Sequence, residues 1–148
     1  MYIGDVLGHD VAPLVERYWE SFIIEDFGGT VDTLLYDEGV CTVYDFKFGK
    51  WPVYAHLNSQ LLCYSALAAE HFDIQEFRGV IVQPNAFKGD KIKTAEYTPE
   101  QVEQHRGLVI AASQSREKHT GDWCRFCSFR TLKQCDEGVA HGKIRNWK

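Results

Sequence analysis

Apolar positions in the first half of the chain change from a helical to a strand-like spacing. Residues 3–16 carry apolar side chains at three- and four-residue intervals, interrupted by Pro13, and predict a helix. Segments rich in β-branched and aromatic residues then predict three strands, over residues 18–24, 30–36 and 40–48. Glycine-containing turns separate these strands, and the second turn indicates a hairpin.

The second half alternates helices with strands. Residues 58–71 have the pattern of a helix with one apolar face, residues 77–82 predict a fourth strand, and an edge strand is expected around 91–95. Thr98-Pro99-Glu100-Gln101 has the composition of a capped helix start, and that helix should run to about Arg116. The order of elements predicts an α/β fold with a mixed (α+β) sheet flanked by helices. A right-handed crossover should connect the third strand to the fourth.

Length and composition indicate one globular domain over residues 1–148. The chain is 45% hydrophobic and 14% aromatic, which is typical of a folded protein. No apolar run approaches the roughly 20 residues needed to span a bilayer, and the first residues lack the features of a secretory signal. We therefore expect a soluble, cytoplasmic protein without a membrane partner.

The net charge of −5 argues mildly against a nucleic-acid partner, but the charge is unevenly distributed. Residues 123–148 carry six basic side chains against Asp136 and Glu137, so this end is locally positive. The rest of the chain is more acidic than the total suggests, as a carboxylate-lined metal site would make it. A basic tail beside an acidic catalytic face is compatible with DNA binding.

Two aspartates and a lysine are expected on neighbouring strands. Asp45 and Lys47 are two residues apart, so both side chains lie on one face of a strand, and Asp32 belongs to the strand before. Oxygen ligands from Asp32, Asp45 and the carbonyl of Phe46 suit Mg²⁺ or Mn²⁺, which neutralises a phosphodiester and activates water. The Lys47 ammonium can orient that water and offset charge in the transition state.

An exposed ion pair is the ordinary interpretation of an isolated Asp-x-Lys sequence. Asp32, which follows two glycines on the preceding strand, and the apolar neighbours of Asp45 favour a catalytic site instead. Gln60 and Tyr64 add a polar pair one turn apart on the next helix.

These motifs together resemble the PD-(D/E)XK nuclease superfamily. The sequences GGTVD ending at Asp32, YDFK containing Asp45 and Lys47, and the Gln60 to Tyr64 segment resemble its RecB-like branch, and most of all phage-encoded members with a C-terminal cysteine cluster. The same set of motifs is also similar to that of the exonucleases of CRISPR adaptation. The resemblance covers about residues 16–135.

The resemblance implies a restriction-endonuclease-like core and a metal-dependent DNA nuclease. Asp32 and Asp45 would be metal ligands, Lys47 catalytic, and Gln60 and Tyr64 would support the site or contact DNA. It also implies an exonuclease of phage DNA recombination or processing, acting in the host cell. A structure-specific endonuclease and a catalytically weak DNA-binding or assembly module are the alternatives.

One element of that family pattern is missing from the sequence. RecB-like nucleases usually carry an acidic residue or histidine on an N-terminal helix that completes the metal site. Glu20, Glu16 and His9 are the candidates here. A homo-oligomer or a partner protein is another possible source of the missing group.

Cys124, Cys127 and Cys135 have metal-binding spacing. Related nucleases hold a 4Fe-4S cluster with four cysteines, one of them near the N-terminus, which this chain lacks. His119 or His141 could instead complete a Zn²⁺ site, and an empty remnant is the third alternative. Cys41 and Cys63 are interpreted as small core residues. Aromatic and basic residues between Trp123 and Trp147 are candidates for packing around this knuckle or for contact with single-stranded DNA.

Overall fold

The computed structural model describes residues 13–115, 117, 119–121, 124, 135 and 136. The chain divides into two compact units, Met1–Ser113 and Gln114–Lys148. The strands and helices below belong to the first unit, apart from the last residue of the second helix. Neither of these two helices, the ones in the described part of the chain, is long and apolar enough to cross a membrane.

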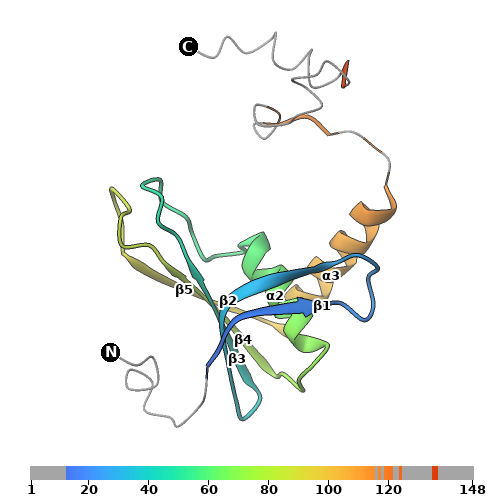
Figure 1. Ribbon diagram of the computed structural model, residues 1–148, viewed down its shortest axis with the longest axis horizontal. Helices are drawn as coiled ribbons and strands as arrows, with labels where there is room; N and C mark the ends of the chain where they lie inside the picture. The colour runs from blue at the N-terminus through green and yellow to red at the C-terminus, as the bar shows by residue number, and fades with distance from the viewer. Residues whose placement is uncertain (1–12, 116, 118, 122–123, 125–134, 137–148) are drawn as a thin grey trace. The chain divides into compact units, whose positions relative to one another are not determined.

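The first unit is built on a five-stranded mixed sheet (Figure 1). Its neighbours follow chain order, and every pair is antiparallel except β3 and β4, which are parallel and are connected through α2. The predicted mixed α+β sheet is therefore confirmed. The elements are β1 (Leu14–Glu20), β2 (Gly28–Asp37), β3 (Val40–Phe46), α2 (Ser59–Ala69), β4 (Glu76–Val82), β5 (Ile92–Tyr97) and α3 (Pro99–Gln114).

The prediction was wrong at the N-terminal end of the sheet. The expected helix lies mostly outside the described residues, and its last residues, from Leu14, belong to the edge strand β1. The strand expected to reach Ile24 ends at Glu20, because Ser21 turns the chain: its Oγ accepts hydrogen bonds from the backbone N–H groups of Ile23 (3.1 Å) and Ile24 (2.8 Å).

A two-residue hairpin connects β2 to β3. Asp37 pairs with Val40, and the two residues between them have positive φ, 44° at Glu38 and 85° at Gly39. Positive φ at both central positions is the geometry whose twist matches a β-hairpin, and glycine accommodates it without strain. The turn predicted from this sequence is confirmed.

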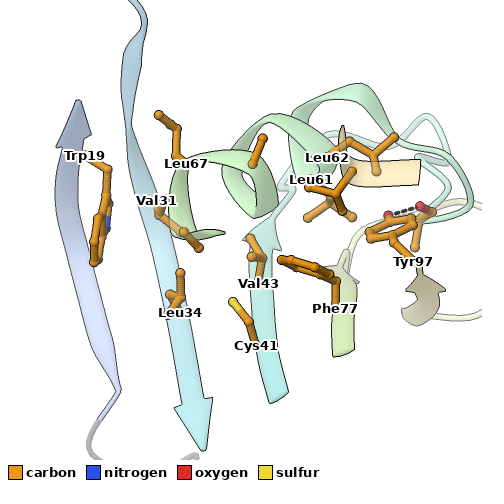
Figure 2. Packing of buried hydrophobic residues seen from close by; sticks show 14 of the residues in the cluster. Trp19, Val31, Leu34, Cys41, Val43, Leu61, Leu62, Leu67, Phe77 and Tyr97 are labelled. Carbon is orange, nitrogen blue, oxygen red and sulfur yellow. Dashed lines mark hydrogen bonds between the residues drawn. The ribbon is translucent and has the colours of Figure 1, made fainter. Parts of the chain in front are cut away.

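Helix α2 covers the sheet and completes the core. Its N-terminus is capped by Asn58, whose side chain accepts hydrogen bonds from the N–H groups of Gln60 (3.0 Å) and Leu61 (3.2 Å). Figure 2 shows leucines of this helix packed against apolar side chains from the strands. The buried cluster includes Trp19, Val31, Leu34, Cys41, Val43, Leu61, Leu62, Leu67, Phe77 and Tyr97.

Helix α3 begins with the predicted capping box. The Thr98 hydroxyl accepts from the Gln101 N–H (3.2 Å), and the Gln101 side chain accepts from the Thr98 N–H (2.9 Å). Val102 is buried in the core, and Arg106 donates to the carbonyl of Ala66 at 2.9 Å, so α3 packs against α2.

Burial of Cys41 makes the fold sensitive to alkaline pH. Desolvation raises the pKa of this thiol from 9.0 to about 12, so the folded state keeps it protonated where the unfolded chain ionises. The unfolding free energy is therefore expected to decline from pH 9 upward, by at most about 1.4 kcal/mol per pH unit from this group. Urea unfolding between pH 8 and pH 11 measures the slope, and Cys41→Ala should flatten it. Equal slopes in both proteins would contradict the prediction.

Candidate active site

Predicted site residues from β3, from the residue that follows it and from α2 form one connected chain of polar contacts. Lys47 Nζ lies 2.9 Å from Asp45 Oδ2 and donates a hydrogen bond to Gln60 Oε1 at 2.7 Å. Gln60 Nε2 in turn donates to the Tyr64 hydroxyl at 3.4 Å. The lysine is thus held between a strand carboxylate and a helix amide, which orients its ammonium.

Asp45 is a buried carboxylate with an unsatisfied oxygen. The residue is only 2% exposed, and its Oδ2 accepts no well-aligned hydrogen bond, although Lys47 lies within ion-pair distance. The Lys47 ammonium is close enough to Asp45 Oδ2 to form an ion pair. It is not aligned to donate a hydrogen bond to that oxygen, so Oδ2 has no hydrogen-bond donor. A buried charge without full compensation is costly, and such groups in proteins pair or coordinate metals. Asp45 therefore has the chemistry of a carboxylate ligand for a cation.

Asp32 joins the site from β2. Its Oδ2 accepts the backbone N–H of Phe46 at 2.9 Å, so this carboxylate lies beside the Asp45-Phe46-Lys47 segment. The carbonyl of Phe46, the third predicted oxygen ligand, lies between the two charged residues in sequence.

The strand changes its alternation at Asp32. Val31 and Leu34 both belong to the core, although a regular strand would place residues three apart on opposite faces. Opposite Asp32 in the register, Glu16 has φ of 46°, a strained value for a residue with a side chain. Local strain of this kind is found preferentially at functional sites.

Gly29, three residues before Asp32 on β2, makes room for the ring of Tyr64 on α2. A Cβ on Gly29 would lie 3.1 Å from Cε1 of Tyr64, so the ring rests directly on the β2 backbone. This close approach explains why a glycine precedes Asp32 and fixes the end of the polar chain that starts at Asp45.

The structure does not bring Glu20 next to Asp32. Glu20 pairs with Gly28, four positions from Asp32 along β2 and so roughly 13 Å away at the usual strand rise. The register places Glu16 opposite Asp32 instead. Within the described residues, no group of three or more His, Cys, Asp or Glu side chains could hold a metal ion. His9 lies outside those residues.

The cysteine cluster is described only in part. Cys124 is buried, and its Sγ accepts from the Gly121 N–H at 3.4 Å, while Cys135 is half-buried. Cys127 and His141 lie outside the described residues, as do Trp123, Arg125, Phe126, Phe129, Arg130, Lys133, Arg145 and Trp147. The predicted ligand set therefore stays a prediction.

The other two cysteines differ from each other. Cys41 is fully buried in the core, as predicted. Cys63 is only half-buried, and its Sγ lies 3.4 Å from Nε2 of His105 on α3. Burial raises the pKa of the Cys63 thiol.

Sequence reasoning missed Gln83, which fixes the loop that leads from Lys47 to α2. This fully buried amide donates to the carbonyls of Gly49 (2.8 Å) and Trp51 (2.6 Å) and accepts from the Val53 N–H (2.9 Å). A glutamine before a proline at the end of a strand looks like a turn residue, so no sequence signal marks it.

Gln83→Leu is expected to lower the unfolding free energy by about 1–3 kcal/mol, because it leaves buried backbone groups without partners. Hydrogen exchange at the Val53 amide should also become faster. Urea unfolding and native-state exchange measure both effects. Asn85→Ala is the matched control, since Asn85 is exposed and makes one 3.3 Å bond to the Phe48 carbonyl. Equal effects of the two substitutions would contradict the role of Gln83.

Comparison with solved structures gives a likeness in fold. The crystal structure of SSO0001 superposes with a TM-score of 0.50 at 18% sequence identity, over 92% of this chain. The chain spans 66% of the length of that protein. At this identity the likeness concerns the fold alone.

Comparison of sequences gives a family. No curated protein matches the chain. A family model described as "Protein of unknown function (DUF2800)" matches residues 14–142, which is most of the sequence and includes every motif of the site. The chain therefore belongs to the DUF2800 family.

Proposed function

We propose that the protein is a Mg²⁺- or Mn²⁺-dependent deoxyribonuclease that hydrolyses DNA phosphodiester bonds. The observation that carries the proposal is the buried, incompletely bonded carboxylate of Asp45, 2.9 Å from a lysine that Gln60 holds in place. A surface ion pair would have neither a buried carboxylate nor a positioned ammonium.

The chemistry follows from the residue types. Asp32, Asp45 and the Phe46 carbonyl would hold the cation, which when bound neutralises the scissile phosphate and activates water. The Lys47 ammonium would offer N–H groups to a phosphate oxygen or to the attacking water. Gln60 orients that ammonium, and Tyr64 fixes Gln60 against the backbone at Gly29.

The resemblance to RecB-like PD-(D/E)XK nucleases, together with a mixed sheet that carries the motifs on β2, β3 and α2, supports an exonuclease of phage DNA processing. Such an enzyme would act in the cytoplasm of the host cell. A structure-specific endonuclease would use the same chemistry with different access to DNA.

A catalytically weak DNA-binding module is the second candidate. It is favoured by one observation: the described residues supply two carboxylates but no third acidic or histidine ligand beside them. A second copy of the chain, a partner protein or a residue outside the described part could complete the site.

Cleavage of end-labelled linear and covalently closed circular DNA with Mn²⁺ tests the proposal. Loss of linear DNA alone, abolished in Asp45→Ala and Lys47→Ala, would establish an exonuclease at this site. Nicking of circles that both substitutions abolish would establish an endonuclease. Activity unaffected by both would refute the assignment, and inactive wild type would favour the binding module.

The cysteines Cys124, Cys127 and Cys135 are proposed to hold a structural 4Fe-4S cluster or Zn²⁺. Thiolates suit either metal, and the role would be to order the C-terminal segment. Iron, sulfide and zinc analysis of the purified protein distinguishes the two, and absence of all three would identify an empty remnant.

A further inference from the structure

Two loops beside the site carry exposed aromatic side chains. The β3–α2 loop and the β4–β5 loop project side by side from the same end of the sheet, and the Phe87 N–H donates to the Lys50 carbonyl at 3.0 Å (Figure 1). We define the aromatic–lysine platform as Phe48, Lys50, Trp51, Tyr54, Phe87 and Lys88.

The aromatic rings of this platform are exposed rather than buried. Trp51 is 80% exposed and Phe48 is 73% exposed, and Tyr54 and Phe87 also lie mostly in solvent. Trp51 and Phe87 contact each other edge to face at 5.2 Å between ring centroids. Large exposed aromatics that cluster on a protein surface mark an interaction site.

The charge of this region is opposite to that of the chain. The first 117 residues contain five lysines, and all five lie in residues 47–58 and 83–93. Those two segments include a single acidic residue, Asp90, while the whole chain carries a net charge of −5. A local cluster of lysines among aromatics complements a polyanion with flat, exposed rings.

The platform is fixed in position relative to the catalytic residues. Its first loop begins after Lys47 and ends at Asn58, the cap of the helix that carries Gln60. The three hydrogen bonds of Gln83 hold that loop, and the Asn85 side chain donates to the Phe48 carbonyl. The first loop of the platform is therefore joined at its two ends to the residues that carry the Lys47 ammonium and the Gln60 amide.

We propose that the platform binds single-stranded DNA, with bases stacked on Trp51 and Phe87 and phosphates held by Lys50 and Lys88. The proposal rests on the proposed nuclease function in so far as it makes this strand the substrate. Stacking needs unpaired bases, so a duplex would first have to fray at its end. The inferred substrate class is thus single-stranded DNA or a single-stranded end.

Fluorescence anisotropy of a labelled oligothymidine tests the proposal with the full chain in EDTA, where no cleavage occurs. Trp51→Ala and Phe87→Ala are expected to weaken binding at least about tenfold. Phe22→Ala is the matched control, because Phe22 is equally exposed (75%) but lies in the loop between β1 and β2. Thermal melts of the variants establish that they are folded.

The contribution of Lys50 and Lys88 is measured separately, through the salt dependence of DNA binding. Lys50→Ala and Lys88→Ala should each reduce the slope of log K against log salt by about 0.7, the value for one phosphate of a single strand. Arg78→Ala is the control, since Arg78 is paired with Glu76 and Glu96 on β4 and β5.

The outcomes separate this proposal from the nuclease proposal. Equal affinity for blunt duplex, no affinity for oligothymidine, or equal losses in Trp51→Ala and Phe22→Ala would each overturn the platform. Binding that depends on Trp51 without any cleavage would support the platform and refute the nuclease. Cleavage that depends on Lys47, together with oligothymidine binding that is unchanged in Trp51→Ala and Phe87→Ala, would support the nuclease and refute the platform.

Discussion

Lys47→Met is expected to lower Mn²⁺-dependent DNA cleavage by about 100- to 1000-fold, the usual cost of removing one preorganised electrostatic group. The substitution keeps the length and most of the volume of the side chain but removes the ammonium that lies between Asp45 and Gln60. The fold should survive, because this side chain is 30% exposed and belongs to the residue that follows β3 rather than to the core.

Single-turnover cleavage of labelled DNA measures the effect, with circular dichroism as the check on folding. Arg78→Met is the matched control: it also removes a cation, but from a half-exposed side chain paired with glutamates. It should cleave at the wild-type rate. A Lys47→Met protein within about tenfold of wild type would contradict the electrostatic role assigned here.

Gln60→Leu should lower DNA cleavage by about tenfold, less than Lys47→Met. It removes the hydrogen bond that the Lys47 ammonium donates to Gln60 and leaves the ion pair of Lys47 with Asp45. An effect as large as that of Lys47→Met would mean that Gln60 contacts DNA itself. The ranking of the two substitutions thus separates positioning from direct contact.

The arrangement of the candidate site residues could be predicted because their motifs are local and the elements that carry them are adjacent. The Asp-x-Lys pair is in contact at 2.9 Å, the hairpin at Glu38-Gly39 brings β2 beside β3, and Asn58 starts the helix that carries Gln60 and Tyr64. Each of these features has its own short-range signal in turn chemistry or capping. Together they bring side chains from three elements to one end of the sheet.

What the sequence did not reveal depends on tertiary contacts. The turn at Ser21, stabilised by hydrogen bonds with the chain and with Glu70, ends β1 four residues before its apolar pattern ends. The irregular alternation at Asp32 and the loop anchored by Gln83 arise from packing between distant segments. The outcome for Glu20 has the same origin, because the register of β1 against β2, which places Glu20 opposite Gly28, cannot be read from the local motifs.

Substitutions of Leu61 and Gly79 are expected to have a large effect on the unfolding free energy. Leu61→Ala, which truncates a fully buried side chain at the start of α2, is expected to lower the unfolding free energy by about 2–5 kcal/mol. Gly79→Ala should cost about 1–3 kcal/mol by overpacking, because a Cβ there would lie 2.7 Å from both Leu61 Cδ1 and the Tyr97 hydroxyl oxygen. Tyr97 cannot easily yield, since it is buried and donates a hydrogen bond to the Ala55 carbonyl (Figure 2).

The double variant should therefore lose less than the sum of the two single losses, by about 1 kcal/mol, since truncating Leu61 opens the space that the new methyl group needs. Urea unfolding of the four proteins measures this coupling. Gly107→Ala is the control: nothing lies within 4 Å of its added Cβ on α3, so its effect should add to that of Leu61→Ala. If Gly79→Ala and Leu61→Ala are strictly additive, the constraint on Gly79 comes from the fixed Tyr97 hydroxyl rather than from the helix. The fit of α2 to the sheet, and with it the placement of Gln60 beside Lys47, would then tolerate more change in the core than the Leu61 contact implies.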